Sequence, residues 1–271
     1  MSATPVSRGT GAEDGVANRP REYVQSLERG LAIIRAFGVD APVQTVSELA
    51  AATGLTRATT RRFLITLMEL GYVDSDGRGF WLTPKVLELG YSFLSGLGFP
   101  DIALPHLERL VAEVDESSEA SVLDGEEIVY VARVPSTAVM TVSVNIGARM
   151  PAHATAMGKV LLAALPDDEL DAYLAEATLT PHLPRTVTDP AQLRAQLMEV
   201  REAGYALVDQ ELEEGLVAIA APVRDRTGKA IGAINLSTHV MRRSAEAVRE
   251  ELLAPLLRTA KRIEADLASV A

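Results

Sequence analysis

The chain has 271 residues, 48% of them hydrophobic, and a formal net charge of −11 at neutral pH. It contains no cysteine, which excludes disulfide bonds, cysteine-based zinc sites and thiol catalysis. The length suits two domains better than one. Because the N-terminus lacks a hydrophobic signal core and no apolar run reaches about 18 residues, we expect a cytoplasmic protein without a membrane partner.

The negative charge is unevenly distributed along the chain. Residues 1–20 are rich in Gly, Ser, Thr, Ala and Pro, so we expect a disordered tail there. Residues 19–90 carry nine basic and eight acidic side chains, whereas residues 91–271 carry 16 basic and 27 acidic ones. The acidic excess therefore lies in the second part of the chain, and the net charge does not argue against nucleic-acid binding by the first part.

Residues 21–84 are predicted to form a winged helix-turn-helix domain. The first helix is expected over Tyr23–Phe37, where apolar side chains recur at helical spacing. Thr45 is the predicted N-cap of a second, short helix. Gly54 is placed to end that helix, because glycine adopts the left-handed conformation at low cost.

A third helix follows, and its composition points to DNA. Thr56 is its predicted N-cap, Phe63, Leu67 and Leu70 are expected on its buried face, and Gly71 is expected to close it. The arginines and Ile65 fall on the opposite face at about 100° per residue. Arginine can bind guanine or phosphate as a bidentate donor. A solvated helical hairpin or a protein-binding helix-turn-helix are the alternative interpretations.

The wing is predicted from Asp76-Gly77, a pair that favours a tight hairpin turn. Arg78 would lie at its tip and could contact phosphate or the minor groove. The predicted contacts with an operator in double-stranded DNA are Thr45, Thr56, Arg57, Ala58, Thr59, Arg61, Arg62 and Arg78.

Residues 85–100 are predicted to form a linker helix that ends in a Gly- and Pro-containing boundary at 96–100. The linker is too apolar to stand alone. We therefore expect it to pack against its copy in another subunit, which makes the protein a homodimer or a tetramer.

Residues 101–271 read as an α+β domain. An amphipathic helix leads into strands, then three helices, three further strands and a closing helix. Six antiparallel strands flanked by helices would leave room for a small ligand. The predicted strands are Glu119–Leu123, Ile128–Val134, Val139–Val144, Tyr205–Gln210, Val217–Arg224 and Ala230–Ser237, and the predicted later helices begin near His153, Asp168, Asp189 and Arg243.

From about Tyr23 to its end the chain resembles the IclR family of transcriptional regulators. The resemblance rests on the segments 23–31, 151–159, 204–215 and 219–223. Residues 182–188 and 234–239 are similar to the subgroup that controls protocatechuate, 4-hydroxybenzoate and β-ketoadipate catabolism. The family implies an N-terminal winged helix and a C-terminal GAF-like effector-binding domain with a curved antiparallel sheet.

The resemblance also implies an effector site for small carboxylates. Backbone amides at a helix start would hold the acid group, which suits the unpaired donors and the dipole of a helix N-terminus. In this chain those amides belong to Thr155, Ala156 and Met157. The family further implies Asp209, Ala218, Asn235 and Ser237 as walls of the site.

Arg133, Met150 and His153 are added as candidate effector contacts from the residues themselves. Arg133 lies in an apolar strand, where a buried guanidinium needs a carboxylate partner. That partner is either the acid group of an effector or an internal acid such as Glu119 or Glu214. His153 either contacts the effector or makes a structural hydrogen bond at the helix start. Asp209 and Glu214 can likewise serve only to hold a loop.

A ligand-responsive regulator of aromatic-acid (β-ketoadipate pathway) genes is the leading functional prediction, with protocatechuate or β-ketoadipate as effector. One alternative is an enzyme that uses His153 with Asp209 or Glu214 as an acid/base pair. A second is an effector-independent DNA-binding oligomer. The sequence has no nucleophile elbow, phosphate loop or metal-ligand spacing, so no cofactor or metal is expected.

Overall fold

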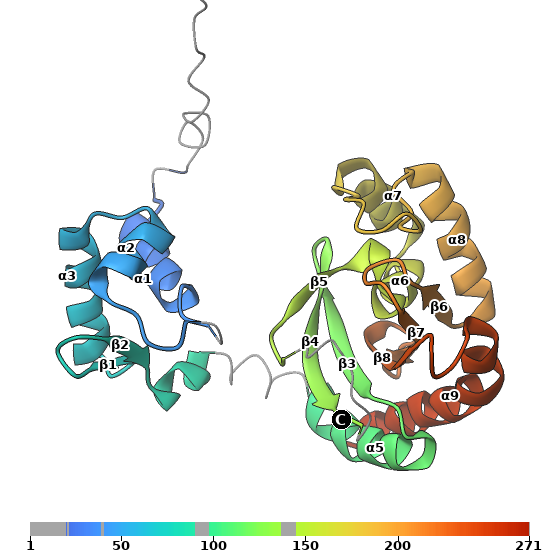
Figure 1. Cartoon of the computed structure of the whole chain (residues 1–271). Coiled ribbons are helices and arrows are strands. Elements are labelled where there is room, and N and C mark those ends of the chain that lie inside the picture. Colours follow the sequence, from blue (N-terminus) through green and yellow to red (C-terminus); the bar gives the residue numbers. More distant parts are fainter. Residues whose placement is uncertain (1–19, 21, 39–40, 90–97, 137–144, 271) are drawn as a thin grey trace, which may run out of the picture. The chain divides into compact units, whose positions relative to one another are not determined.

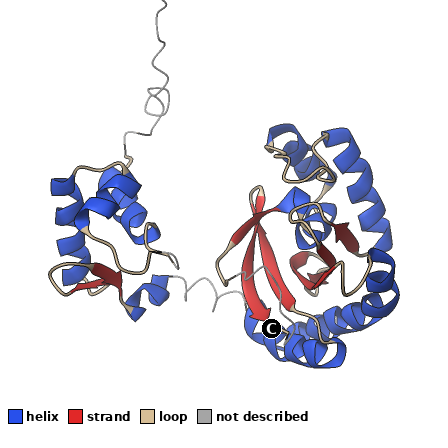
Figure 2. Ribbon diagram, in the orientation of Figure 1, coloured by secondary structure: helices blue, strands red, loops and turns tan. Residues whose placement is uncertain are grey.

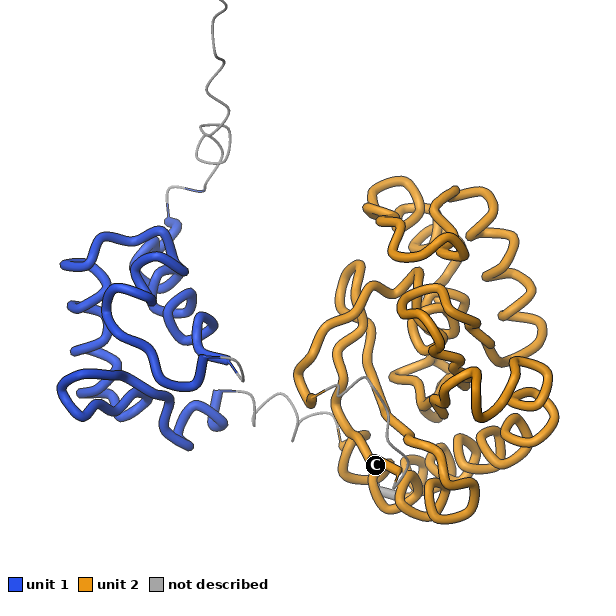
Figure 3. Tube along the Cα trace, viewed as in Figure 1, with its two compact units in different colours: residues 1–92 blue, residues 93–271 orange. Residues whose placement is uncertain are grey.

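The computed structural model describes residues 20, 22–38, 41–89, 98–136 and 145–270 (Figure 1). The chain divides into two compact units, residues 1–92 and residues 93–271 (Figure 3). The predicted tail before Pro20, the strand predicted at Val139–Val144 and residues 90–97 of the predicted linker lie outside the described residues. No described helix combines the length and the apolar character that a membrane crossing needs.

The first unit contains the predicted three helices and wing (Figure 2). The two strands pair antiparallel, with Ser75 opposite Phe80 at the end of the hairpin. The core beneath them is formed by Ile33, Leu49, Leu64, Leu67 and Val73. The elements are α1 (Gln25–Arg35), α2 (Val46–Thr53), α3 (Arg57–Glu69), β1 (Val73–Ser75) and β2 (Phe80–Leu82).

The predicted capping residues of this unit are confirmed. The Thr45 hydroxyl accepts a hydrogen bond from the Glu48 amide, and the Glu48 carboxylate accepts one from the Thr45 amide at 2.7 Å, which completes a capping box. Gly54 ends α2 with φ at 67°, in the left-handed region. Thr56 caps α3 by accepting from the Thr59 amide at 3.2 Å.

The buried face of α3 differs from the predicted one. Thr60, Leu64 and Leu67 are buried, whereas Leu70 is 52% exposed and Phe63 is only partly buried. Leu70 is the C-cap residue, where the chain leaves the helix before turning at Gly71. A side chain at the end of the helix therefore does not continue the stripe that the middle of the helix buries.

The described part of the predicted linker is short. Pro84–Val86 forms a 3₁₀ turn (η1) that Thr83 caps, and helical residues continue to Leu89. Helix α5 (Phe99–Val114) begins inside the predicted boundary segment, with Gly98 as its N-cap at φ 58°. The Phe99 ring lies so close to Gly232 that any Cβ there would meet it at 2.3 Å, which anchors this end of α5 in the second unit.

The second unit is built on a six-stranded antiparallel sheet in the order β5-β4-β3-β8-β7-β6. Five of its strands follow the predicted ones, and the short edge strand β5 was not predicted. Its strands are β3 (Ser118–Asp124), β4 (Glu127–Val134), β5 (Arg149–Pro151), β6 (Ala206–Asp209), β7 (Leu216–Arg224) and β8 (Ala230–His239).

Helices cover both faces of this sheet (Figure 1). Helices α5 and α9 (Ala245–Val270) pack on one face through a core that includes Leu107, Val217 and Leu256. On the other face lie a 3₁₀ turn, η2 (Ala152–Ala154), and three helices: α6 (Ala156–Ala163), α7 (Asp167–Glu176) and α8 (Pro190–Ala203). The α+β class with an antiparallel sheet between helices is thus confirmed.

The two faces of the sheet carry different side chains, because side chains alternate along a strand. In β7 and β8, Val217, Ile219 and Leu236 point into the core under α5 and α9. The opposite face carries the small Ala218 and the polar Asn235 and Ser237, which lie toward α6. Small and polar side chains on that face leave a space that large apolar side chains would fill.

Candidate functional site

The outer side of α3 carries most of the predicted DNA contacts of the first unit. Arg57, Ala58, Arg61 and Arg62 are all exposed there. Among the described residues, none of these three arginines has an acidic partner within ion-pair distance. Three cations on one helix face, with a small residue among them, form a surface that can approach a phosphate backbone closely.

The wing presents one further cation. Asp76 accepts hydrogen bonds from the amides of Arg78 and Gly79 at 2.9 and 2.8 Å, and these bonds lower the pKa of its carboxyl. Gly77 has φ at 87°, which only glycine adopts cheaply. The Asp76 side chain and the turn at Gly77 thereby fix the loop, and the exposed Arg78 side chain remains available at the tip.

Three predicted DNA-contacting residues have structural partners. Thr45 bonds Glu48 in the capping box, and the Thr56 hydroxyl donates to the Thr59 hydroxyl at 2.9 Å. These threonines stand at the starts of α2 and α3, where amides also favour a phosphate. Their hydroxyls are therefore shared between capping and any contact with DNA.

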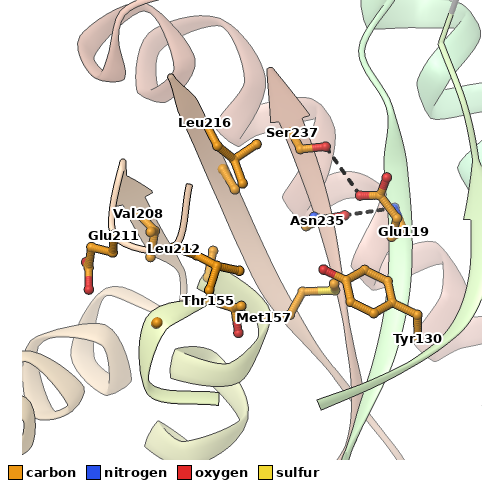
Figure 4. A pocket seen from close by; sticks show the side chains of 13 residues that line it. Glu119, Tyr130, Thr155, Met157, Val208, Glu211, Leu212, Leu216, Asn235 and Ser237 are labelled. Atoms are coloured by element: carbon orange, nitrogen blue, oxygen red, sulfur yellow. Dashed lines mark hydrogen bonds between the residues drawn. The ribbon is translucent and has the colours of Figure 1, made fainter. Parts of the chain in front are cut away.

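The second unit contains a small cavity between α6 and the sheet (Figure 4). The cavity volume is about 50 Å³, compared with the roughly 10–15 Å³ that one ordered water requires. Six predicted effector contacts line it, namely Thr155, Ala156, Met157, Ala218, Asn235 and Ser237. Sequence reasoning missed the other main lining residues, Glu119, Tyr130, Val208, Glu211, Leu212 and Leu216.

The start of α6 forms one wall of the cavity. The Thr155 hydroxyl caps the helix by accepting from the Gly158 amide at 3.1 Å. The first amides of a helix have no acceptor within the helix, which leaves those of Ala156 and Met157 for another acceptor. Helix α6 can pack against the backbone at Ala152 because Gly158 has no side chain: a Cβ there would be 2.1 Å from the Ala152 carbonyl oxygen.

Glu119 on β3 forms the polar wall, and Figure 4 shows it beside Ser237 and Asn235. The residue is 5% exposed, and the Ser237 hydroxyl donates to its carboxylate over a long 3.4 Å. The Asn235 side-chain oxygen accepts from the Glu119 amide at 2.8 Å. Burial raises the pKa of the Glu119 carboxyl, while hydrogen bonding to Asn235 and the charge of Arg133 oppose that rise.

A second carboxylate at the cavity is already paired. Glu211 accepts a hydrogen bond from the buried Lys159 ammonium at 2.5 Å, and Gln196 takes a second one from that ammonium at 3.1 Å. Burial lowers the pKa of Lys159, and the neighbouring Glu211 opposes this effect. The pair joins α6 to the segment after β6 and thereby holds one side of the cavity.

Four predicted effector contacts lie away from the lining of this cavity. Arg133 faces Glu119, with Nε to Oε1 at 3.8 Å, which is the arrangement that the salt-bridge alternative expected. Met150 lies on β5 opposite Ile128 and packs into the core around α6. Asp209 pairs with Arg185 on the surface.

His153 lies in a separate surface depression on the far side of η2. Its Nε2 is 3.1 Å from the Thr180 carbonyl oxygen, and its ring centre is 6.0 Å from that of His182. Burial lowers the pKa of His153. Within the described chain, no cluster of three or more His, Asp or Glu side chains is arranged to hold a metal ion.

The missed polar residues left a weak signal in the sequence. Glu119 is a charged residue inside an otherwise buried strand, and Tyr130 shares the face of Ile128 by strand alternation. Leu212 comes from a loop whose path depends on the fold, and nothing in its sequence neighbourhood indicates a ligand.

Two family models together match most of the chain: the IclR helix-turn-helix domain over residues 26–77 and the bacterial transcriptional regulator IclR C-terminal domain over residues 92–265. The chain is 40% identical to the Pca regulon regulatory protein of Pseudomonas putida, over 89% of this chain and 83% of that protein. A proposed transcriptional regulator from Rhodococcus sp. RHA1 has a crystal structure with a TM-score of 0.83 and 54% identity, over 92% of this chain and 100% of that one. An IclR homologue from Microbacterium hydrocarbonoxydans, solved with 4-hydroxybenzoate, has a TM-score of 0.79 and 27% identity, over 89% and 98%.

The Lys159–Glu211 pair makes a stability prediction. Lys159→Met should lower the free energy of unfolding by about 3–5 kcal/mol, because it leaves the Glu211 carboxylate buried without its cation. Urea denaturation of the full chain measures this loss. Lys229→Met, at an exposed lysine in the β7–β8 turn, is the control and should cost less than about 0.5 kcal/mol. Equal midpoints for the two variants would contradict the role of the pair.

Proposed function

The chain belongs to the IclR family of DNA-binding transcriptional regulators, and we propose that it controls genes for the catabolism of aromatic acids. Its Pseudomonas putida relative is a Pca regulon regulator, and a structural neighbour was solved with 4-hydroxybenzoate. The observation that carries the proposal is the cavity at the start of α6, where first-turn amides, which have no acceptor within the helix, lie beside apolar side chains such as Met157, Leu212 and Leu216. Such a site suits a small ring that bears an acid group.

The proposed effector is a small aromatic carboxylate. The acid group would accept hydrogen bonds from the amides of Ala156 and Met157, where the helix dipole also favours an anion. The ring would lie against Met157, Leu212 and Leu216. No Lys or Arg is among the described side chains that line the cavity, so the amides are the main source of positive potential.

The proposed DNA contact is made by α3 and the wing. Arg57, Arg61 and Arg62 would enter or flank the major groove, and Arg78 would bind the adjacent backbone. The arginines are exposed and unpaired among the described residues, which supports this assignment. Action on chromosomal DNA implies a cytoplasmic location.

We propose that the active form is a homodimer or a tetramer. Val24, Leu27 and Leu87 are 60%, 62% and 72% exposed in the single chain, which is unusual for residues of this size. A second copy that covers them would bring two winged helices to one operator. The operator would then consist of pseudo-palindromic half-sites.

Regulation would follow from a population shift. An effector that binds one state of the second unit more tightly changes the operator affinity by the same coupling free energy. A coupling of about 1–3 kcal/mol is sufficient for a switch of about 5- to 150-fold. Either a repressor or an activator can be built on such a coupling.

The structure favours this proposal over catalysis in the cavity. His153 and Asp209, two members of the acid/base set that the enzyme alternative requires, do not line the cavity. Asp209 is engaged by Arg185, and His153 faces Thr180 and His182. We therefore assign no catalytic role to these residues.

The recognition arginines are tested by substitution. Arg57→Ala and Arg61→Ala should each weaken operator binding by about 1–3 kcal/mol, because each removes a groove contact. A gel shift with the upstream intergenic region measures the loss. Arg226→Ala, an exposed arginine in the β7–β8 turn, is the matched control and should bind as the parent does. Operator affinity that survives the double substitution would rule out this DNA contact.

The anion-binding amide is tested by Ala156→Pro. Proline is tolerated at the first position of a helix, and Thr155 already has the extended conformation that precedes proline, with φ −117° and ψ 147°. The variant should therefore fold, but it lacks the amide donor. We expect aromatic acids to bind at least about tenfold more weakly, since hydrogen bonds to charged groups contribute about 1.5–3 kcal/mol.

Isothermal titration calorimetry measures this loss, and thermal melting without ligand checks the fold. Ala156→Ser keeps the amide and serves as the control. A folded Ala156→Pro protein that binds the acid as tightly as Ala156→Ser would show that the carboxylate is held elsewhere.

A further inference from the structure

We propose that Glu119 selects the effector by accepting a hydrogen bond from a hydroxyl group on its ring. The protein would then bind hydroxylated aromatic monocarboxylates and reject dicarboxylates. This inference rests on the proposed function, because it requires the acid group of the ligand to lie at the start of α6. Figure 4 shows Glu119 on β3 and Thr155 at the start of α6, at different walls of the same cavity.

The Glu119 carboxylate has acceptor capacity left over. A carboxylate offers about four lone-pair sites. The Asn235 side chain contributes one hydrogen bond, the Ser237 hydroxyl reaches the carboxylate only at 3.4 Å, and the Arg133 Nε only at 3.8 Å. These contacts do not use all of its lone pairs, and two of them are long. The buried carboxylate therefore gains from a further, closer donor, because burial of a charge is costly unless hydrogen bonds replace water.

The other carboxylate of the cavity provides an internal comparison. Glu211 is held by the Lys159 ammonium at 2.5 Å, and its carboxylate points away from the cavity in Figure 4. Its charge is therefore compensated on the side opposite the ligand. Oε2 of Glu211 is buried without a hydrogen-bond partner among the described residues, but it belongs to this ion pair and lies away from the cavity, whereas Glu119 lies at the wall formed by β3 and β8, beside Ser237.

The surroundings of Glu119 disfavour a second negative charge. The groups that face it are Tyr130 and Arg133 from β4, Asn235 and Ser237 from β8, and the thioether of Met157 from α6. Arg133 lies against Glu119 itself and does not line the cavity. A dicarboxylate held at α6 would thus place its second acid group beside a carboxylate, without a lining cation to offset the repulsion.

The two ligand classes predict proton linkage of opposite sign. A ligand hydroxyl that donates to Glu119 favours the ionised carboxylate, so binding releases a proton from any molecules in which Glu119 is protonated. A second ligand carboxylate would instead require Glu119 to hold a proton, so binding would take one up. Burial raises the pKa of Glu119, so the sign of this linkage can be followed by titration at several pH values.

The test is calorimetric titration of the full-length protein with 3-hydroxybenzoate, 4-hydroxybenzoate, benzoate and adipate. At least one hydroxybenzoate should bind about tenfold or more tightly than benzoate, and adipate should bind most weakly; tenfold corresponds to about 1.4 kcal/mol. In Glu119→Gln, which keeps the shape but removes the charge, the hydroxyl preference should fall below about threefold and adipate should bind more tightly than it does to the parent. Glu113→Gln, at an exposed glutamate on α5, is the matched control and should retain the parent pattern.

Repeating the parent titrations from about pH 6 to pH 8, in buffers of different ionisation enthalpy, tests the same proposal without a variant. Hydroxybenzoate affinity should hold or rise with pH. Four results would each overturn the role of Glu119 while the proposed effector site stands. The first two are hydroxybenzoates that bind no better than benzoate, and a hydroxyl preference that is unchanged in folded Glu119→Gln. The other two are adipate that binds more tightly than the hydroxybenzoates, and proton uptake on binding of hydroxybenzoate. If none of the four acids binds, the proposed effector class itself fails.

Discussion

The close packing of α6 against the backbone at Ala152 is the constraint on which the candidate effector site depends. A side chain at Gly158 would meet the Ala152 carbonyl at 2.1 Å, so only glycine allows this approach. The approach places the first turn of α6 directly over the sheet, and Thr155 satisfies the Gly158 amide within that turn. The remaining amides then face a cavity rather than solvent, where an anion gains most from them.

The sheet supplies the complementary half of the site through side-chain alternation. One face of β7 and β8 is filled with large apolar side chains under α5 and α9, while the other carries Ala218, Asn235 and Ser237. Asn235 also bonds the Glu119 amide, so the same residue shapes the cavity and ties β8 to β3. The cavity thus results from small and polar residues at alternate positions of the strands. The apolar core on the opposite face of the sheet, under α5 and α9, stabilises the fold.

The structure also explains which features could be predicted from the sequence. The N-caps at Thr45 and Thr56 were predictable because each is a local interaction between residues three positions apart, and Gly54 was predictable because glycine adopts the left-handed conformation at low cost. Leu70 was misplaced because periodicity alone does not show where a helix ends. Six cavity residues were predictable by family resemblance, whereas Glu119 and Tyr130 come together only when β3 and β4 are set beside β8. Arg133 faces Glu119 across the β3–β4 pair, and Glu119 is one of the two internal acids that the sequence offered as its partner.

The central claim is that a small aromatic acid in the second unit controls DNA binding by the first. Fluorescence anisotropy of a labelled operator, titrated with the full-length protein in the absence and presence of saturating hydroxybenzoate, tests it directly. The account predicts a change in operator affinity of about fivefold or more in either direction, with the reciprocal change in effector affinity when operator is present. Identical operator affinities under saturating effector would contradict it.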